Sequence, residues 1–296
     1  NQLVTAHAAV AGWADTMPER EFLHQPVDGR LRVTTFIEAE DQARRMATAL
    51  TALGMNPGDR VAILAKNCAE WVLADLAIAM AGLVSVPIYP TANADTVAYI
   101  IGHSEAKALF VGKLDDPDEI GSAIPDELPT IAFPYPTVEC RHSWQDLVEN
   151  AEPFAEPNQP SPEDAMTVLY TSGSTGRPKG VVISYRAYVY GCTAALGVMK
   201  TGTEDRVLSY LPLSHIAEQM FTIHIPTTVG SAVYYATSID ELADNLKEVQ
   251  PTVFAAVPRV WEKFYAGVTG QLAQTEGAKA KIASWAMDVG RKANAV

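Results

Sequence analysis

The hydrophobic and polar positions along the chain alternate between helical and strand periods. After Thr35, apolar side chains recur at helical spacing, Thr35 and Glu38 have the spacing of a capping box, and Gly54 ends the pattern. Strands and helices are then expected in alternation at 61–65, 67–81, 84–88, 93–103 and 108–111. Asn67 and Glu70 are expected to cap the second of these helices. This alternation predicts a parallel sheet covered by helices.

The same pattern resumes after a proline-rich connector. Nine of the 19 prolines lie between residues 115 and 164, where regular structure should be sparse. We therefore expect one subdomain at 1–160 and a second at 161–296. Further strands are expected at 166–170, 207–211, 232–235 and 253–257. Ser238 and Glu241 have the spacing of a second capping box, for a helix to about residue 249. The predicted fold class is α/β, with layered, largely parallel sheets and covering helices.

Composition and charge narrow the class of function. The chain has 296 residues, of which 48% are hydrophobic and 19% charged, which excludes a disordered protein. Its net charge of −13 would repel a phosphate backbone, so no nucleic-acid partner is expected. Residues 1–160 carry 10 basic and 23 acidic side chains, whereas 161–296 carry 12 of each. An anionic ligand is therefore expected in the second part.

The cysteines and apolar runs bear on location. Cys68, Cys140 and Cys192 form no CxxC or Cys/His spacing, so we expect a reducing, cytoplasmic compartment. The longest apolar run, 72–88, is interrupted by an aspartate, a glycine and a proline. It is too weak to predict a membrane span.

The segment with the clearest chemistry reads Tyr-Thr-Ser-Gly-Ser-Thr-Gly-Arg-Pro-Lys-Gly at 170–180 and follows a predicted strand. Gly173 and Gly176 permit backbone angles that turn several N–H groups into one concavity, and the hydroxyl side chains add donors. Lys179 adds a positive charge. The spacing is not that of a Walker A loop. A flexible polar connector is the alternative, against which Pro178 and the preceding strand both argue. We therefore predict a phosphate-binding loop.

This loop closely resembles the signature of the adenylate-forming, AMP-binding enzymes. Further resemblances occur at 81–90, at Leu211-Pro212-Leu213-Ser214-His215 and at 251–263. The last of these is similar to the form found in long-chain and very-long-chain acyl-CoA synthetases, including the bubblegum type. The implied fold is part of the large N-terminal domain of such an enzyme.

The resemblance implies a two-step reaction. A long-chain fatty carboxylate attacks the α-phosphate of ATP to give acyl-AMP and pyrophosphate, and the thiol of coenzyme A then displaces AMP. Mg²⁺ is the implied metal ion. The implied phosphate-positioning residues are Thr171, Ser172, Gly173, Ser174, Thr175, Gly176 and Lys179. Of these, Lys179 is also a candidate catalytic residue.

The resemblance adds candidates outside the loop. His215 is implied to line the channel between carboxylate and nucleotide, as a catalytic and substrate-binding residue; a structural cap is its alternative. Glu218 is a candidate metal ligand or an ordinary helix glutamate. Gln219 stands where some long-chain relatives have a gating Trp.

Three positions near the end of the chain also bear on the site. Arg259 is a candidate substrate-binding residue, with an ion pair to Glu262 as the alternative. Trp261 and Phe264 are expected in a core, with an acyl-tunnel wall as the other interpretation.

Several family elements have no match here: the Gly-Tyr-Gly-x-Thr-Glu segment, the ribose-binding Thr-Gly-Asp, and the C-terminal domain with its lysine. The chain therefore looks like the front portion of such an enzyme, expected to be inactive alone. The alternatives are a truncated, non-catalytic nucleotide-binding module and a ligase that delivers acyl-AMP to a carrier protein. Peripheral membrane contact and a homodimer are further expectations.

Overall fold

The computed structural model describes residues 4–171 and 176–293. The chain divides into two compact units, Asn1–Val253 and Phe254–Val296. The helices of the first unit are α1 (Ala6–Thr16), α2 (Phe36–Ala52), α3 (Ala69–Met80), α4 (Ala94–Ser104), α5 (Pro117–Gly121), α6 (Trp144–Asn150), α7 (Tyr185–Val198), α8 (Ile216–Gln219), the π-helix η1 (Met220–His224), α9 (Ile225–Val229) and α10 (Leu242–Val249). The second unit consists of α11 (Pro258–Ala273) and α12 (Gly277–Ala293).

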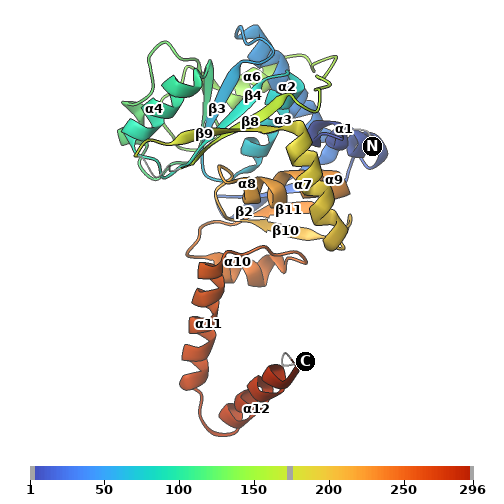
Figure 1. Ribbon diagram of the computed structural model, residues 1–296, viewed down its shortest axis with the longest axis vertical. Helices are drawn as coiled ribbons and strands as arrows, with labels where there is room; N and C mark the ends of the chain where they lie inside the picture. The colour runs from blue at the N-terminus through green and yellow to red at the C-terminus, as the bar shows by residue number, and fades with distance from the viewer. Residues whose placement is uncertain (1–3, 172–175, 294–296) are drawn as a thin grey trace. The chain divides into compact units, whose positions relative to one another are not determined.

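Two sheets organise the first unit (Figure 1). Its strands are β1 (Glu21–Val27), β2 (Arg30–Thr35), β3 (Arg60–Leu64), β4 (Val84–Ile88), β5 (Ala108–Val111), β6 (Thr130–Ala132), β7 (His142–Ser143), β8 (Ala165–Thr171), β9 (Lys179–Ser184), β10 (Arg206–Ser209) and β11 (Ala232–Tyr235). One sheet has the order β7-β6-β5-β3-β4-β8-β9 and the other β10-β11-β1-β2. The β8–β9 and β1–β2 pairs are antiparallel, and the remaining pairs are parallel.

The α/β prediction is confirmed. Both sheets contain strands from either side of residue 160, because β8 joins β4 and the β1–β2 hairpin joins β11. The division at 160 stays a prediction about subdomains. In the described part of the chain, no helix is long and apolar enough to cross a bilayer.

The core forms where helices cover the sheets. Phe36, Met46 and Leu50 of α2 are fully buried, and α3 is buried along almost its whole length. The capping box at Thr35 is confirmed: its hydroxyl accepts from the Glu38 N–H, and the Glu38 carboxylate accepts from the Thr35 N–H. Burial of these apolar side chains is the main stabilising contribution to the fold.

The expected Asn67–Glu70 cap of α3 is wrong. The N-cap residue is Cys68, which makes no side-chain capping bond. Asn67 instead donates to the Leu211 carbonyl at 2.6 Å, and Glu70 accepts from the Tyr135 hydroxyl at 2.6 Å. Tertiary partners far away in the sequence therefore outcompete the local cap.

Two later predictions also need correction. At 253–257 the ladder is a single bridge between Val207 and Val253. The next residue, Phe254, is the first of the second unit. The helix near 240 begins at Leu242. Ser238 lies before it in a turn, where its hydroxyl accepts a hydrogen bond from the Glu241 N–H. Glu241 accepts from the Thr237 hydroxyl, so the reciprocal half of a capping box is missing.

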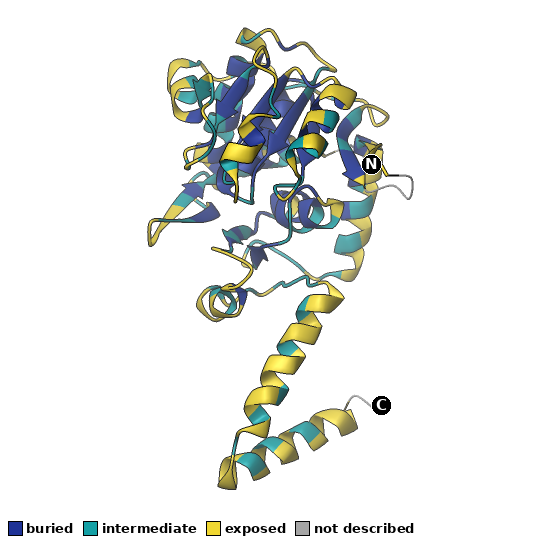
Figure 2. Cartoon of the chain, turned by 90° about the vertical axis from the view of Figure 1, so that its left-hand side faces the viewer, coloured by how far each residue is buried: buried dark blue, intermediate teal, exposed yellow. Residues whose placement is uncertain are grey.

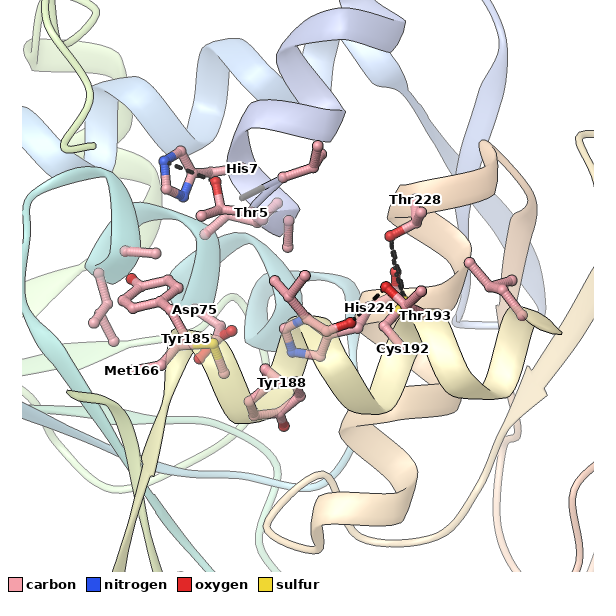
Figure 3. A pocket seen from close by; sticks show the side chains of 17 residues that line it. Thr5, His7, Asp75, Met166, Tyr185, Tyr188, Cys192, Thr193, His224 and Thr228 are labelled. Atoms are coloured by element: carbon pink, nitrogen blue, oxygen red, sulfur yellow. Dashed lines mark hydrogen bonds between the residues drawn. The ribbon is translucent and has the colours of Figure 1, made fainter. Parts of the chain in front are cut away.

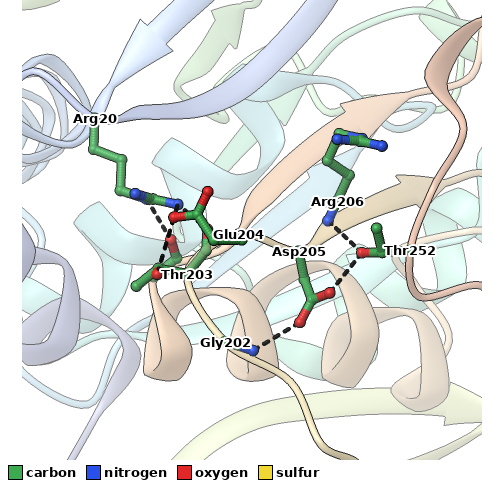
Figure 4. A network of polar contacts seen from close by, with 8 residues as sticks. Arg20, Gly202, Thr203, Glu204, Asp205, Arg206 and Thr252 are labelled. Atoms are coloured by element: carbon green, nitrogen blue, oxygen red, sulfur yellow. Dashed lines mark hydrogen bonds and ion pairs between the residues drawn. The ribbon is translucent and has the colours of Figure 1, made fainter.

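A polar network fixes the start of β10 (Figure 4). Asp205 accepts from the Gly202 N–H at 2.7 Å and from the Thr252 hydroxyl at 2.6 Å. Thr252 in turn accepts from the Arg206 N–H, and Arg20 pairs with Glu204 at 3.2 Å. The network holds the segments before β1 and after α10 against the strand that leads to His215.

Candidate functional site

The antiparallel β8–β9 pair forms the base of the predicted phosphate loop. Thr171, the last residue of β8, is the register partner of Lys179, the first residue of β9, and both are exposed. Gly176 has φ of +101°, a conformation that only glycine adopts readily. Ser172, Gly173, Ser174 and Thr175 lie outside the described residues. The hairpin brings a hydroxyl and an ammonium group to the mouth of the loop.

Tyr170 anchors this base. Its ring is 4% exposed, and its hydroxyl lies 2.8 Å from His103 Nδ1 on α4. Its register partner is Gly180, where a Cβ would come within 3.2 Å of Tyr170 Cζ and 3.0 Å of Val168 Cγ1. Gly180 therefore makes room for the Tyr170 ring. The sequence showed the Tyr and Gly of the motif but gave no sign of His103.

A second cation lies beside the loop. The Arg177 guanidinium is 5.2 Å from the centre of the Tyr99 ring on α4. A cavity of about 630 Å³ opens here, lined by Asn93, Asp95, Thr96, Tyr99, Gly176, Arg177 and Pro178. The loop thus borders a space large enough for a nucleotide-sized ligand.

His215 is the N-cap residue of α8, and its side chain is exposed. Its Nδ1 accepts from the Ala217 N–H at 3.2 Å, which leaves Nε2 to carry the ring proton. Among the described residues, no hydrogen bond joins His215 to Thr171 or Lys179. The capping alternative is therefore present in the structure, and the catalytic role of His215 stays a prediction.

Two side chains that the sequence analysis placed in other roles hold the turn before His215. The Asn67 amide donates to the Leu211 carbonyl and accepts from the Leu213 N–H at 3.0 Å. Gln219 donates to the Leu213 carbonyl at 2.8 Å and accepts from the buried Tyr188 hydroxyl. The position of His215 is thus fixed from both sides by amide side chains.

Glu218 is buried inside this arrangement. One carboxylate oxygen, Oε1, accepts from the Ser209 hydroxyl at 2.8 Å, the Thr222 hydroxyl at 2.8 Å and the Tyr210 N–H at 3.1 Å. Burial raises the pKa of the carboxyl to about 7, although these hydrogen bonds lower it. The geometry supports a structural role that ties β10 to η1.

Within residues 4–171 and 176–293, no group of three or more His, Cys, Asp or Glu side chains is placed to hold a metal ion. Glu218 already accepts several hydrogen bonds from protein donors. The assignment of Glu218 as a metal ligand stays a prediction.

A separate cavity of 410 Å³ lies between the start of α1, α3, α7 and the η1–α9 segment (Figure 3). Tyr185, Tyr188 and Cys192 line it from α7, and His224 lines it from η1. Burial lowers the pKa of His224 to about 3 and raises that of Asp75, which also faces the cavity, to about 6. Among the described residues, no Lys or Arg lines this cavity. A ligand carboxylate would therefore find no counter-charge in it.

Arg259 belongs to the second unit, as the second residue of α11, and is exposed. In the described part of the chain it makes no ion pair with Glu262. Its substrate-binding role stays a prediction. Trp261 packs edge-on against Phe254 and Phe264 but remains 54% exposed, so the expected core position is wrong for it.

The two α/β sheets and the loop at the β8–β9 turn are the arrangement of an adenylate-forming enzyme. Solved structures of that class superpose on the chain. The inhibitor-bound N-terminal domain of FACL13 from Mycobacterium tuberculosis matches with a TM-score of 0.72 and 25% identity, over 86% of this chain and 63% of that one. The acyl-adenylate complex of o-succinylbenzoate CoA synthetase from Bacillus subtilis matches with a TM-score of 0.70 and 22% identity, over 87% and 63%.

Residues 10–290 match the AMP-binding enzyme family, and the chain belongs to that family. The long-chain-fatty-acid–CoA ligase ACSBG2 of Rattus norvegicus is 34% identical over 280 residues, 88% of this chain and 42% of the rat protein. Long chain acyl-CoA synthetase 1 of Arabidopsis thaliana is 32% identical over 256 residues, 79% of this chain and 38% of the plant protein. The chain thus spans about two fifths of the length of these relatives.

Proposed function

We propose that the protein is an ATP-dependent long-chain fatty acid–CoA ligase. A carboxylate oxygen of the fatty acid attacks the α-phosphorus of ATP, and the bond to pyrophosphate breaks. The coenzyme A thiol, losing its proton, then attacks the acyl carbonyl and AMP leaves. The single observation that carries this proposal is the 170–180 loop on its β8–β9 base, in a chain 34% identical to a long-chain ligase.

The residues of the loop supply electrostatic stabilisation in this proposal. Thr171 and Lys179 present a hydroxyl and an ammonium group at the loop mouth, and Thr175 adds a hydroxyl to the loop sequence. Such donors stabilise negative charge as it moves toward the departing pyrophosphate. Mg²⁺ stays a prediction of the resemblance, and no step here depends on it.

The cavity beside Tyr188 is our candidate for part of the acyl chain. Leu76, Ile78, Met166, Val189 and Leu196 contribute apolar surface to it. Tyr188 also contacts Gln219, four residues after His215, so the cavity adjoins the segment implied to lie near the carboxylate. Because the cavity lacks cationic side chains, it suits the chain of a fatty acid rather than its carboxylate.

Coenzyme A is the acceptor that we favour, because the curated relatives are named as CoA ligases. A carrier-protein acceptor is the second candidate. Cytoplasmic location and a homodimer stay predictions.

The test uses full-length protein, ATP and acids of graded length. Pyrophosphate release should require a long-chain acid, and added coenzyme A should convert the product to a thioester. A Val189→Trp variant, which narrows the cavity, should shift the preference toward shorter acids; Val181→Trp, on exposed β9 surface, is the control. Release with short or aromatic acids but none with palmitate would reject the long-chain assignment.

A further inference from the structure

Helix α3 carries two acidic side chains in different surroundings. Glu70, in its first turn, is buried with Arg32 and the Tyr135 hydroxyl as partners. Asp75, near its middle, makes no salt bridge within the described residues. Asp75 and Ala79 are the two half-buried residues of an otherwise buried helix, and both line the 410 Å³ cavity that we assign to part of the acyl chain (Figure 2). The Asp75 carboxyl therefore faces this cavity rather than the core.

The cavity around Asp75 supplies no positive charge. Figure 3 shows the Asp75 side chain directed into the cavity among Tyr185, Tyr188 and His224. Burial lowers the pKa of His224 to about 3 and also lowers the pKa of His7, which lines the same cavity, so both rings are neutral at pH 7. Among the described residues, Asp75 is thus the single lining residue that can carry a charge at this pH.

A plain alkyl chain is a poor match for this part of the wall. Burial raises the pKa of Asp75 to about 6, and Ser85 on β4 partly opposes the shift, so the carboxyl is mostly ionised at neutral pH. Methylene groups placed against a carboxylate remove its water and return no hydrogen bond, which is unfavourable. A carboxylate has about four acceptor positions, so the interaction with Ser85 leaves room for a donor on a ligand.

Two more polar atoms at this cavity lack a partner. The Tyr185 hydroxyl and His224 Nε2 are buried and make no hydrogen bond in the described part of the chain. Their residues are 4% and 7% exposed. Buried polar groups of folded proteins are nearly always hydrogen-bonded. Unpartnered groups that gather with Asp75 around one cavity therefore favour a ligand that is polar at this point.

We propose that the cavity selects long-chain acids that carry a hydroxyl group on the chain, with that hydroxyl donating to the Asp75 carboxylate. The inference rests on the proposed ligase function and names its substrate class more narrowly. It also accounts for the direction in which the acid enters, because the charge of Asp75 repels the carboxylate of the substrate and keeps that end out of the cavity.

An ammonium group on the chain is the other donor that would suit a carboxylate. The remaining wall is largely apolar, with Leu76, Met166 and Val189 among its residues. Removing a cation from water into such surroundings costs more than removing a hydroxyl, and one carboxylate compensates for it poorly. The hydroxyl is therefore the better match.

The experiment measures binding and turnover separately in the full-length protein. Hexadecanoic acid is compared with its monohydroxylated forms, substituted at carbon 3, 8, 12 or 16. Binding is followed by calorimetric titration without ATP, and turnover by pyrophosphate release with ATP. The test variant is Asp75→Leu, which removes the acceptor at similar side-chain size. Asp75→Asn keeps one acceptor oxygen, and Asp118→Leu, at an exposed position of α5, is the matched control.

At least one hydroxylated acid should bind about tenfold more tightly than hexadecanoic acid and show a similar gain in kcat/KM, the effect of one hydrogen bond to a charged group. Asp75→Leu should lose this preference and bind hexadecanoic acid more tightly than the parent does. Asp75→Asn should keep part of the preference, and Asp118→Leu should keep all of it. Asp75→Leu should be at least as stable to urea as the parent, because it removes an unpaired buried carboxylate.

Equal binding of all these acids by the parent, a preference that survives in Asp75→Leu, or tighter binding of the corresponding amino-substituted acids would overturn the inference. Asp75-dependent binding of a hydroxylated acid without pyrophosphate release would reject the ligase function but not the hydroxyl site. Release with hexadecanoic acid and no preference for any hydroxylated form would reject the hydroxyl site alone.

Discussion

At the scale of single residues, the polar side chains around His215 hold that residue in position. Glu218, Asn67 and Gln219 each hold the 209–215 segment by hydrogen bonds. Their bonds leave His215 exposed at a fixed helix start. Any catalytic contribution of His215 therefore depends on the neighbours that fix its position.

Substituting Glu218 by Gln tests this structural role through pH. The folded-state pKa of about 7 lies above the ordinary value of 4.5, so the folded protein binds the extra proton and stability falls as pH rises from about 4.5 to 7. The fall amounts to at most about 3 kcal/mol. In Glu218→Gln most of this fall in stability should disappear. A smaller fall of the same sign should remain because of Asp75, whose pKa is raised to about 6.

The measurement is urea unfolding at pH 5, 6, 7 and 8. The control is Glu248→Gln, on the exposed face of α10. An unchanged pH slope in Glu218→Gln would mean that the buried carboxyl is ionised in the folded protein throughout this range.

At the scale of elements, the two capping-box sequences form a matched pair. Thr35 is a true N-cap with both reciprocal hydrogen bonds, whereas Ser238 lies in a turn before α10. Thr35→Ala should lower the free energy of unfolding by about 1 kcal/mol. Ser238→Ala should lower it by less than half as much. Denaturant unfolding of both variants checks this, and equal losses would contradict the difference in geometry.

Local patterns predicted the elements whose signals lie within the element itself. The strands β3, β4 and β5 and the helices α2 and α4 begin and end close to the positions expected from period and caps. The β1–β2 hairpin was missed although it has a local signal: Asp28 and Gly29, both with positive φ, form its two-residue turn. The strand expected at 253–257 failed because apolar composition alone does not supply a pairing partner.

The candidate site was also predictable only where its signal lies within one segment of the sequence. The motif at 170–180 was visible in the sequence, and the structure pairs Thr171 with Lys179 across its base. The supports of the site were not visible: His103 reaches Tyr170 from α4, and Asn67 reaches Leu211 from a distant loop. Such contacts depend on tertiary structure, and spacing along the chain carries no trace of them.

At the scale of the whole molecule, the two units of the chain differ in net charge and in the groups that they present. The first unit is strongly acidic yet presents two cations, Arg177 and Lys179, at the loop beside α4. The second unit is basic and exposes apolar stripes. In our account the first unit contributes the phosphate loop and the acyl cavity.

The central claim is that the loop at 170–180 is the phosphate clamp of fatty-acid adenylation. The most direct measurement is fatty-acid-dependent ATP–pyrophosphate exchange by the full-length protein without coenzyme A. We predict a loss of about 10²-fold for Thr175→Ala, and of the same order for Thr171→Ala, with a modest change in apparent ATP affinity. Lys179→Ala should lose less of the exchange rate, because the lysine side chain is flexible. The control, Lys107→Ala, should exchange at the parent rate. Exchange at the parent rate in both Thr175→Ala and Lys179→Ala would contradict the claim.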